Sequence, residues 1–419
     1  MQIDKIGILG LGYVGLPLAI SFGKSIHCIG YDIDKIRINN LKKGIDKNQE
    51  FTKKIIKNSL KLKITGRLLD LNVCKYLIVT APTPINLNKE PDLSFIKKAA
   101  IDISKIIKKD MVIILESTVY PGVTEDFFGK IITQKSGLIV NKDFFLGYSP
   151  ERINPGDKVH TLERVTKVIS GSNNTATKKI YNLYSKIIKK VHISKNIKTA
   201  EAAKVIENIQ RDVNIALVNE YYQLFDKLKL NPHDVLKTAS TKWNFLNFKP
   251  GLVGGHCIGV DPYYLTYLAK TKGYNPKLIL AGREINDSMH IYIIKSLIKK
   301  INLSNKGFSK IKILILGATF KENCSDLRNS GSIKFFNELK KYNNNLHIYD
   351  PVADQRLLKK ITKIGVVNNL KANYYNLIIL LVPHKSFKKD KKKINKSLKL
   401  DGQYYDFNKS TKLDKIRFS

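Results

Sequence analysis

Cysteine is scarce in this sequence: the 419 residues include only Cys28, Cys74, Cys257 and Cys324, which lie far apart with no CxxC pair. This spacing excludes a disulfide framework and the common zinc cages, so we expect no metal site. No run approaches the roughly 18 apolar residues that a membrane span requires. An apolar strand starting at residue 3 leaves no room for a signal peptide. We therefore expect a reduced, cytoplasmic protein without a membrane partner.

Acidic residues and arginine are both few beside lysine. The chain has 73 basic and 35 acidic residues, for a net charge of +38, but only nine of the basic residues are Arg, and Lys is spread from end to end. Nucleic-acid-binding proteins more often concentrate basic residues on one element, with aromatic platforms between them. We attribute the charge mainly to compositional bias and expect no nucleic-acid partner; its functional part is attraction of anionic small molecules. Each Arg inside a motif is then a candidate for binding phosphate or carboxylate.

The chain is too long for one ordinary core, and its pattern changes along its length. It opens with a strand, a Gly-rich turn, a helix and a second strand, and apolar strands follow at 76–80, 111–116 and 144–148. This alternation predicts a parallel, doubly wound sheet. A helix without Pro or Gly covers about 199–229, a second helical stretch covers 261–301, and strand-like runs return from residue 310.

We therefore predict an α/β fold with two doubly wound, Rossmann-like parallel-sheet domains joined by a central helical region. The expected boundaries are 1–198 for the first α/β domain, 199–305 for the helical region and 306–419 for the second α/β domain. The Lys-rich stretch 388–396 is expected to be a solvated helix face, and the turn at 349–351 to end a strand.

A Gly-rich turn, Gly10-Leu11-Gly12-Tyr13-Val14-Gly15, lies between the first strand and the first helix. In such GxGxxG turns the first Gly permits a tight turn, the second lets the backbone approach a pyrophosphate, and the third allows close helix–strand packing. Asp32 ends the next strand, where an acid can accept hydrogen bonds from a ribose 2′-hydroxyl and would repel a 2′-phosphate. The pattern predicts NAD rather than NADP, the alternative being a purely structural turn.

The most informative segment is 248–261, FKPGLVGGHCIGVD, which surrounds Cys257 with glycines and ends on Asp261. Free cysteines are most often small buried hydrophobes, as we expect for Cys28, Cys74 and Cys324. In a loop whose glycines expose backbone to a ligand, a nucleophilic Cys257 is the better interpretation. His256 is adjacent in sequence and poorly placed as a Cys–His base, so a protease is not indicated.

Five motifs occur in the order found in the nucleotide-sugar 6-dehydrogenases, the UDP-glucose/GDP-mannose dehydrogenase family, which the chain resembles over essentially its whole length. They are the GxGxxG turn, Ser117–Gly122, Ser149–Arg152, the Cys257 loop, and Phe320-Lys321 with Asp326 and Arg328. Three sequence segments resemble those of the UDP-N-acetylhexosamine branch: GYSPERINPGDK, WNF and GLVGGHCIGVDPYYL. Val260 stands where the UDP-glucose enzymes have Lys, which makes UDP-glucose a less suitable substrate.

The resemblance implies NAD-dependent, four-electron oxidation of a UDP-N-acetylhexosamine at C6 to the uronate, for surface polysaccharide biosynthesis. Two NAD would be used in sequence, through a thiohemiacetal and a thioester on Cys257. Lys204 and Asp261 match the family residues for removing the alcohol proton, Glu151 the one that assists thioester hydrolysis, and Thr118 the one that places a water. The implied catalytic residues are Cys257, Lys204, Asp261, Glu151, Asn208 and Thr118.

The resemblance also implies that 1–198 is an NAD-binding domain, 199–305 a dimerisation region and 306–419 a UDP-sugar-binding domain. Binding residues are implied in the same way. Those for the cofactor are Gly10, Gly12, Tyr13, Val14, Gly15, Asp32, Thr83, Thr118 and Arg328. Those for the substrate are Glu151, Lys204, Asn208, Arg211, Phe248, Gly251, Gly254, Arg283 and Lys321.

Helical spacing puts Lys204, Asn208 and Arg211 on one face, where a solvated polar stripe is the alternative. Glu201 and Glu220 are expected to be helix-face charges. Arg283 matches an Arg that reaches the neighbouring subunit's substrate, which implies a homodimer or larger homo-oligomer; an ordinary ion pair is its alternative.

Other classes of function remain as rivals. A non-catalytic nucleotide sensor of this fold would have lost at least one of Cys257, Lys204, Glu151 and Asp261, and all four are present. A two-electron hydroxyacid dehydrogenase would have no use for a nucleophilic Cys, and UDP-glucose 6-dehydrogenase activity is the nearest alternative within the family. The sequence leaves open whether the sugar is gluco or galacto at C4.

Overall fold

A computed structural model describes residues 5–48, 50–153, 159, 161–302 and 307–409. The chain divides into two compact units: an N-terminal unit of residues 1–207 with 263–274, and a C-terminal unit of residues 208–262 with 275–419. Our three-part division stays a prediction, and its second boundary, at 305/306, lies outside the described residues.

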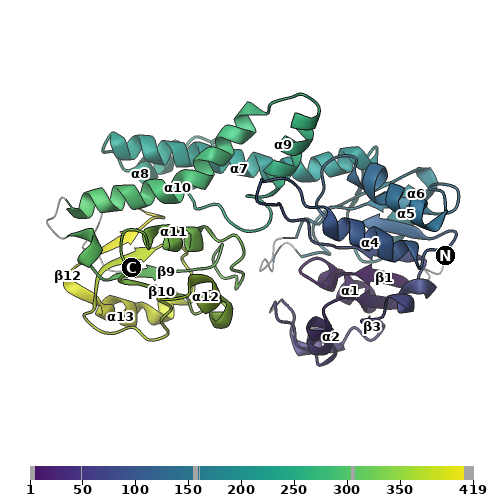
Figure 1. Ribbon diagram of the computed structural model, residues 1–419, viewed down its shortest axis with the longest axis horizontal. Helices are drawn as coiled ribbons and strands as arrows, with labels where there is room; N and C mark the ends of the chain where they lie inside the picture. The colour runs from purple at the N-terminus through teal and green to yellow at the C-terminus, as the bar shows by residue number, and fades with distance from the viewer. Residues whose placement is uncertain (1–4, 49, 154–158, 160, 303–306, 410–419) are drawn as a thin grey trace. The chain divides into compact units, whose positions relative to one another are not determined.

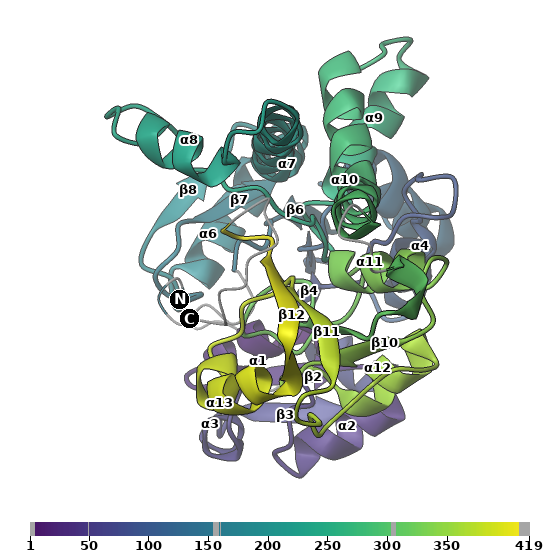
Figure 2. The same ribbon diagram turned by 90° about the vertical axis from the view of Figure 1, so that its left-hand side faces the viewer.

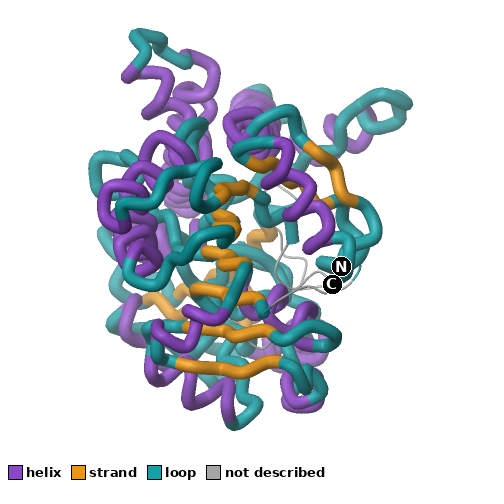
Figure 3. Tube along the Cα trace, turned by 90° about the vertical axis from the view of Figure 1, so that its right-hand side faces the viewer, coloured by secondary structure: helices purple, strands orange, loops and turns teal. Residues whose placement is uncertain are grey.

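An eight-stranded sheet with the order β3-β2-β1-β4-β5-β6-β7-β8 organises the N-terminal unit. Neighbours from β3 to β6 pair in parallel, β7 runs antiparallel to β6, and β8 is parallel to β7. The strands lie side by side in the tube view (Figure 3). Their bounds are β1 Ile6–Leu9, β2 Cys28–Tyr31, β3 Leu62–Thr65, β4 Tyr76–Val79, β5 Val112–Leu115, β6 Phe145–Tyr148, β7 Lys167–Gly171 and β8 Val191–Ile193.

Helices cover both faces of this sheet, because its central strands are apolar on both sides. Ile6, Ile8 and Ile78 pack in one layer with α1 and α6, whereas Leu77 and Val79 pack in the other with α4, η2 and α5. The predicted doubly wound sheet is confirmed. The helices are α1 Gly15–Gly23, α2 Lys35–Lys42, α3 Lys53–Lys57, η1 Leu68–Val73, α4 Ser94–Ser104, the π-helix η2 Val123–Gly129, α5 Lys130–Ser136 and α6 Asn174–Tyr184.

A four-stranded parallel sheet with the order β10-β9-β11-β12 forms the core of the C-terminal unit. Ile313 and Ile315 face α10, α11 and α12, whereas Leu314 and Leu316 face α13. β11 and β12 are side by side in Figure 2. The elements are α8 Pro232–Ala239, α10 Lys277–Asn302, η3 Phe308–Lys310, β9 Ile313–Leu316, α11 Gly331–Leu339, β10 Leu346–Tyr349, α12 Gln355–Thr362, β11 Tyr375–Leu380, α13 Phe387–Ser397 and β12 Leu398–Asp406.

Two further helices connect the units in sequence: α7, Ile197–Lys227, and α9, Asp261–Thr271 (Figure 1). The predicted long helix is thus confirmed, and the second predicted helical stretch is broken between α9 and α10. The lysines of α13 are exposed, as expected for a solvated face. None of the helices in the described part of the chain has the length and apolarity needed to cross a membrane.

Candidate active site

The Gly-rich turn follows β1, and its three glycines have different environments. Gly10 has a φ of +94°, and a Cβ there would lie 3.0 Å from the Thr80 carbonyl oxygen. A Cβ on Gly15, the first residue of α1, would lie 1.9 Å from the Gly10 carbonyl oxygen, so this contact permits no side chain. Around Gly12 a Cβ would meet nothing within 4 Å. Gly10 and Gly15 are therefore required by the turn itself, whereas Gly12 leaves open backbone, as a bound pyrophosphate requires.

Asp32 follows β2 and borders the same turn. Its carboxylate accepts hydrogen bonds from the backbone N–H of Leu11, at 2.8 Å, and of Asp34, at 2.9 Å, and remains partly exposed. Further lone pairs stay available to a ribose hydroxyl. The arrangement fits the dinucleotide that the sequence predicts.

Arg37 was missed by the sequence analysis. Its Nε donates to the Leu11 carbonyl oxygen at 2.9 Å, and its Nη1 forms a buried ion pair with Asp46 at 2.7 Å. Arg37 thus stabilises the Gly-rich turn through the Leu11 carbonyl group. Its position three residues after the N-cap Asp34 of α2 gave no signal of this role.

The other candidate cofactor residues of this unit also lie where parallel strands end. Thr83 follows β4, and its carbonyl oxygen accepts from the Tyr264 hydroxyl of α9 at 2.6 Å. Thr118 lies in the loop after β5, and Tyr13 and Val14 lie in the turn after β1. Ligands of open α/β sheets bind outside the carboxyl ends of the strands. These candidates all lie at that edge of the sheet, where we expect the cofactor to bind.

Glu151 comes three residues after β6. Its Oε1 accepts from the backbone N–H groups of Arg152 and Ile153, both at 2.6 Å. Its Oε2 is buried, accepts no hydrogen bond from any described residue and lies 3.7 Å from Nζ of Lys167. The carboxylate is therefore held by its own loop on one side and faces a cation on the other.

Glu201 and Lys204 lie one turn apart on α7. The expectation that Glu201 is a helix-face charge is wrong. Its carboxylate is fully buried and accepts from the backbone N–H groups of Gly122 and Thr124, at 2.6 and 2.8 Å, and from the Thr124 hydroxyl at 2.6 Å. Burial raises its pKa to about 7, against the lowering effect of these hydrogen bonds. Glu201 thus anchors the end of the loop that carries Thr118, whereas Glu220 is exposed as expected.

Lys204 is 8% exposed and makes no hydrogen bond or ion pair with any described residue. A buried ammonium without a counter-charge is costly. Lys204 is therefore suited to meet a negative charge on a ligand, and the solvated-stripe alternative does not fit its burial. Arg211, on the same helix, is exposed.

In the C-terminal unit, Asn208 of α7 donates from Nδ2 to Oδ2 of Asp261 at 2.5 Å, and both side chains are buried. Asp261 is the first residue of α9, and its backbone N–H donates to the Cys257 carbonyl oxygen at 2.9 Å. Cys257 is exposed, whereas the other three cysteines are buried, as predicted for them. The N-terminal end of a helix favours negative charge, so this position suits a nucleophilic thiol.

Other contacts fix the shape of the Cys257 loop. Asn219 of α7 donates to the Gly251 carbonyl oxygen at 3.0 Å and accepts from the Gly251 N–H at 2.9 Å. A Cβ on Gly254 would lie 2.7 Å from the Asn329 carbonyl oxygen, and one on Gly255, at φ +83°, would lie 2.8 Å from the Phe320 ring. The loop thus packs closely against the segment after β9, and Phe248 at its start is half-buried.

Arg283 of α10 is 3% exposed and forms ion pairs within its own chain. Its Nη1 lies 2.6 Å from Asp212 and its Nη2 lies 2.5 Å from Asp287. A Cβ on Gly259 would lie 3.9 Å from the guanidinium, so Arg283 also borders the Cys257 loop. These contacts fit the ion-pair alternative, and its reach to a neighbouring subunit's substrate stays a prediction.

Lys321 and Arg328 lie in the segment between β9 and α11. Lys321 is half-buried, with Nζ 5.5 Å from the centre of the Phe320 ring. Arg328 is exposed and forms a bidentate pair with Asp326, the shortest N–O distance being 2.7 Å. Partial burial and the charge of Arg328 lower the pKa of His256, which favours a neutral imidazole beside Cys257.

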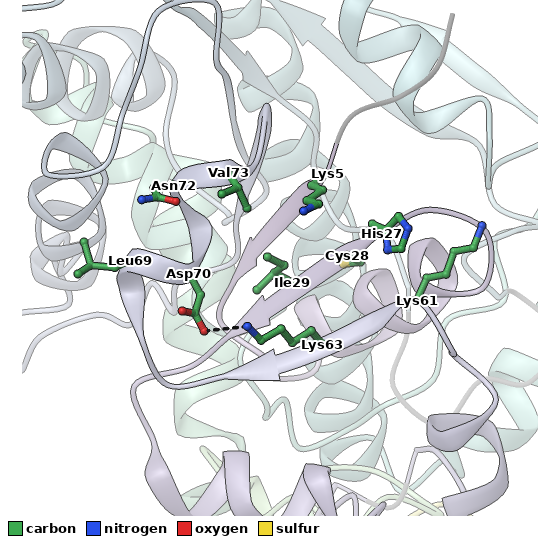
Figure 4. Close-up of a pocket in the computed structure, with 10 residues that line it drawn as sticks. All are labelled: Lys5, His27, Cys28, Ile29, Lys61, Lys63, Leu69, Asp70, Asn72 and Val73. Carbon is green, nitrogen blue, oxygen red and sulfur yellow. Dashed lines mark ion pairs between the residues drawn. The ribbon is translucent and has the colours of Figure 1, made fainter.

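A pocket elsewhere in the N-terminal unit does not belong to this site. It is lined by Lys5, His27, Lys61, Lys63 and Asp70 among others, with Lys63 and Asp70 paired at 3.3 Å (Figure 4). Lys5, His27 and Lys61 immediately precede β1, β2 and β3. The pocket is therefore at the amino ends of the strands, opposite the edge that carries the Gly-rich turn.

Comparison with known sequences and structures agrees with this arrangement. Profiles of the UDP-glucose/GDP-mannose dehydrogenase family match residues 4–188 as its NAD binding domain, 198–288 as its central domain and 314–408 as its UDP binding domain. Protein CapL of Staphylococcus aureus is 45% identical over 416 residues, covering 99% of this chain and 98% of CapL. The UDP-N-acetyl-D-glucosamine 6-dehydrogenase of Pseudomonas aeruginosa is 46% identical over 392 residues, covering 93% and 92% of the two chains.

The UDP-D-ManNAc dehydrogenase structure from Pyrococcus horikoshii superposes with a TM-score of 0.86 at 29% identity, covering 99% of this chain and 97% of that one. The chain belongs to the UDP-glucose/GDP-mannose dehydrogenase family. It is accordingly an oxidoreductase with an NAD-binding and a UDP-binding domain, and its cofactor is NAD.

The glycine environments make a paired prediction. Gly15→Ala should lower the free energy of unfolding by about 1–3 kcal/mol, because its methyl group would overlap the Gly10 carbonyl. Gly12→Ala should change stability by less than about 0.5 kcal/mol. It should nevertheless weaken NAD binding, because its methyl group would occupy the space beside the backbone where we expect the pyrophosphate. Urea unfolding and NAD titration measure the two effects. An equal loss of stability in both variants would contradict this division of roles.

Proposed function

We propose that this enzyme oxidises C6 of a UDP-N-acetylhexosamine to the carboxylate, giving a UDP-N-acetylhexosaminuronate for surface polysaccharide biosynthesis. Two of the compared relatives bear names that specify N-acetylated UDP-sugars, and Val260 replaces the Lys expected of UDP-glucose enzymes. The relatives at 45–46% identity include UDP-N-acetyl-D-glucosamine 6-dehydrogenases, which favours the gluco sugar over the galacto sugar.

The exposed thiol of Cys257 carries this proposal. Oxidation of an alcohol to an acid removes two hydrides, and an aldehyde cannot lose the second one until a nucleophile has added to its carbonyl. When bound, NAD accepts the hydride at each oxidation. A two-electron dehydrogenase would not need the thiol that precedes α9.

We assign the first proton transfer to Asp261 and Lys204. The C6 hydroxyl must lose its proton as the hydride leaves, either to the Asp261 carboxylate directly or through a water held there. Asn208 keeps Asp261 in place through its hydrogen bond at 2.5 Å. Lys204, with no counter-charge among the described residues, stabilises the developing alkoxide.

Cys257 then adds to the aldehyde as a thiohemiacetal, and the thiol proton passes to the former carbonyl oxygen. Loss of the second hydride from carbon, with loss of that hydroxyl proton to water, leaves a thioester. Water must attack the thioester carbonyl and lose a proton, and the thiolate leaves as the carboxylate forms. We assign the proton acceptance to Glu151 and placement of the water to Thr118. The buried Oε2 of Glu151 supports this role, because it accepts no hydrogen bond from the described residues and so keeps lone pairs for a proton.

Binding of the nucleotide sugar is assigned to residues of both units. We propose that Lys321 and Arg211 bind anionic or hydroxyl groups of the substrate, that Phe248, Gly251 and Gly254 form its surroundings in the Cys257 loop, and that Arg328 contacts the cofactor.

We further propose that the enzyme is a homodimer formed through α7. Ile206, Leu217 and Leu224 are between 44% and 53% exposed, and Leu228, just beyond the helix, is 58% exposed. Their spacings of 11, 7 and 4 residues are close to whole helical turns, so they form one apolar stripe. An exposed stripe of this kind is typical of a protein–protein contact.

A substrate comparison tests the proposed reaction. Purified enzyme with NAD should oxidise UDP-N-acetylglucosamine with the highest kcat/KM, UDP-N-acetylgalactosamine more slowly and UDP-glucose least, followed by NADH absorbance and by mass spectrometry of the uronate. Two NADH should form per sugar. Formation of one NADH per sugar with release of free aldehyde would exclude the four-electron reaction.

The thioester makes a separate prediction. Glu151→Gln should keep both hydride transfers and slow hydrolysis by about 10²–10⁴-fold, the usual effect of losing a general base. A burst of two NADH per site should precede a slow steady state, and the protein mass should rise by one acyl group that hydroxylamine removes. Cys257→Ala is the control and should form no adduct. Uronate production by Cys257→Ala at the wild-type rate would refute the covalent mechanism.

The dimer makes a third prediction. Leu217→Glu with Leu224→Glu should shift the mass in solution from two chains to one, because two charges would enter an apolar contact. Light scattering after size exclusion measures this. Leu60→Glu is a matched control at an 89% exposed site off the stripe and should stay dimeric. A monomeric wild-type enzyme with full activity would refute the proposal.

A further inference from the structure

A buried ion cluster adjoins Glu151 in the N-terminal unit. It consists of Lys167, the first residue of β7, Glu116, which follows β5, and Tyr184, the last residue of α6. Nζ of Lys167 lies 2.7 Å from Oε2 of Glu116, and the Tyr184 hydroxyl donates to Oε1 of Glu116. The Lys167 side chain is 1% exposed and that of Glu116 is 0% exposed. The sequence analysis singled out none of the three residues.

The antiparallel direction of β7 explains how Lys167 reaches this place. Tyr148 of β6 pairs with Ser170 of β7, and continuing that register for three residues sets Lys167 opposite Glu151. A strand parallel to β6 would begin at the other end of the sheet. The reversal therefore brings the first side chain of β7 to the carboxyl edge, where Glu116 and Glu151 follow their strands.

Lys167 is a fixed cation at this edge. Burial alone would lower its pKa, but the charges of Glu116 and Glu151 raise it above its ordinary value. Its ammonium also donates to the Pro150 carbonyl oxygen at 3.3 Å and lies over the Tyr184 ring, 5.4 Å from its centre. The ammonium is thus held from β5, from α6 and from the loop that carries Glu151.

Glu151 is the member of the cluster that is not needed to balance the buried charge of Lys167. Glu116 already pairs with the Lys167 ammonium at 2.7 Å, so a second acid at 3.7 Å is not needed to balance this one buried cation. An acid that the fold does not need, placed beside a buried charge, is a candidate for a functional role. The neighbouring Arg152 does not supply the missing cation to Oε2, because its guanidinium pairs with Glu207 of α7. Lys167 is accordingly the cation that faces Oε2, at 3.7 Å.

We propose that Lys167 is a positioning residue for Glu151: its fixed positive charge, 3.7 Å from Oε2, stabilises and orients the Glu151 carboxylate for accepting the proton of the hydrolytic water. Glu116, held by Tyr184, limits how much of that charge acts on Glu151. This rests on the role of Glu151 in thioester hydrolysis proposed above. Lys167 does not touch the reacting atoms, so its effect should appear in the pH dependence of one step.

The test uses two substitutions with opposite expected signs. Lys167→Met removes the cation at similar length, so the acid limb of the hydrolysis rate should move to higher pH by about 1 unit or more, because a nearby positive charge that stabilises a carboxylate is lost. Glu116→Gln removes the competing anion, so the limb should move to lower pH. Lys167→Arg keeps the charge and should leave the limb close to wild type. Rapid-quench measurement of acyl-enzyme decay by intact mass, across a pH series, isolates this step, and the burst of two NADH should persist in Lys167→Met.

Each outcome supports or overturns the proposal. A folded Lys167→Met protein with an unmoved acid limb, or shifts of the same sign in Lys167→Met and Glu116→Gln, would overturn it and leave the cluster a structural ion pair. Should Lys167→Met not fold, Glu116→Gln decides alone: a downward shift supports the proposal and no shift overturns it. Glu151→Gln distinguishes failure of the proposed role of Glu151 from failure of the proposed role of Lys167. If that variant hydrolyses the acyl-enzyme at the wild-type rate, the role of Glu151 fails, whereas slow hydrolysis with an unmoved Lys167→Met limb overturns only the role of Lys167.

Discussion

Parallel pairing of β1 to β6 is the constraint on which the N-terminal half of the chemistry depends. Parallel strands end at one common edge, so the segments that follow them meet there without any pairing between those segments. The Gly-rich turn, Asp32, Thr118 and Glu151 all follow such strands. The same pairing requires helices on both faces, which is why the central strands are apolar throughout. The one reversed neighbour, β7, then contributes a residue from its start instead of its end.

The two sheets repeat one turn and use it differently. In each, a Gly with positive φ follows the first strand, Gly10 at +94° and Gly317 at +90°. In each, an Asp after the neighbouring strand accepts from the backbone N–H that follows this Gly: Asp32 from Leu11 at 2.8 Å, and Asp350 from Ala318 at 2.7 Å.

The two carboxylates differ in what else they bind. Asp350 is 2% exposed and also accepts from the N–H groups of Val352 and Ala353 and from His384. Burial alone would raise the pKa of Asp350, but the hydrogen bonds from His384 and the backbone lower it. The hydrogen-bond acceptors of Asp350 are therefore used within the fold, whereas the Asp32 carboxylate can still accept a hydrogen bond from a ligand. Asp350 therefore does more than end a strand, and one of its partners, the buried His384, lies more than thirty residues away in the sequence.

Periodicity and glycine placement were sufficient to predict β1, β2, β4, β5 and β6, the long helix and the cofactor turn, because those signals are local; β3, β7 and β8 were not predicted. Contacts distant in sequence were not predictable in this way. Glu201 has the spacing of an exposed helix residue, yet it anchors Gly122, because the loop after β5 approaches α7 only in the folded chain. The rule that a rare Arg has a ligand-binding task also has limits: Arg37 is buried in an ion pair with Asp46 and supports the Gly-rich turn.

Lysine shows most clearly what composition cannot distinguish. Among the described lysines only Lys167 and Lys204 are buried, and the amino-acid composition of a chain so rich in Lys identifies neither of them. Their surroundings separate them. Lys167 lies between carboxylates that keep it charged and fixed in place, whereas Lys204 has no charged or hydrogen-bonding partner in the described part of the chain. An unpaired buried ammonium lowers stability, so the presence of Lys204 favours a role in which the substrate brings the compensating negative charge. The charge of Lys167, in contrast, is already balanced by acids of the protein itself.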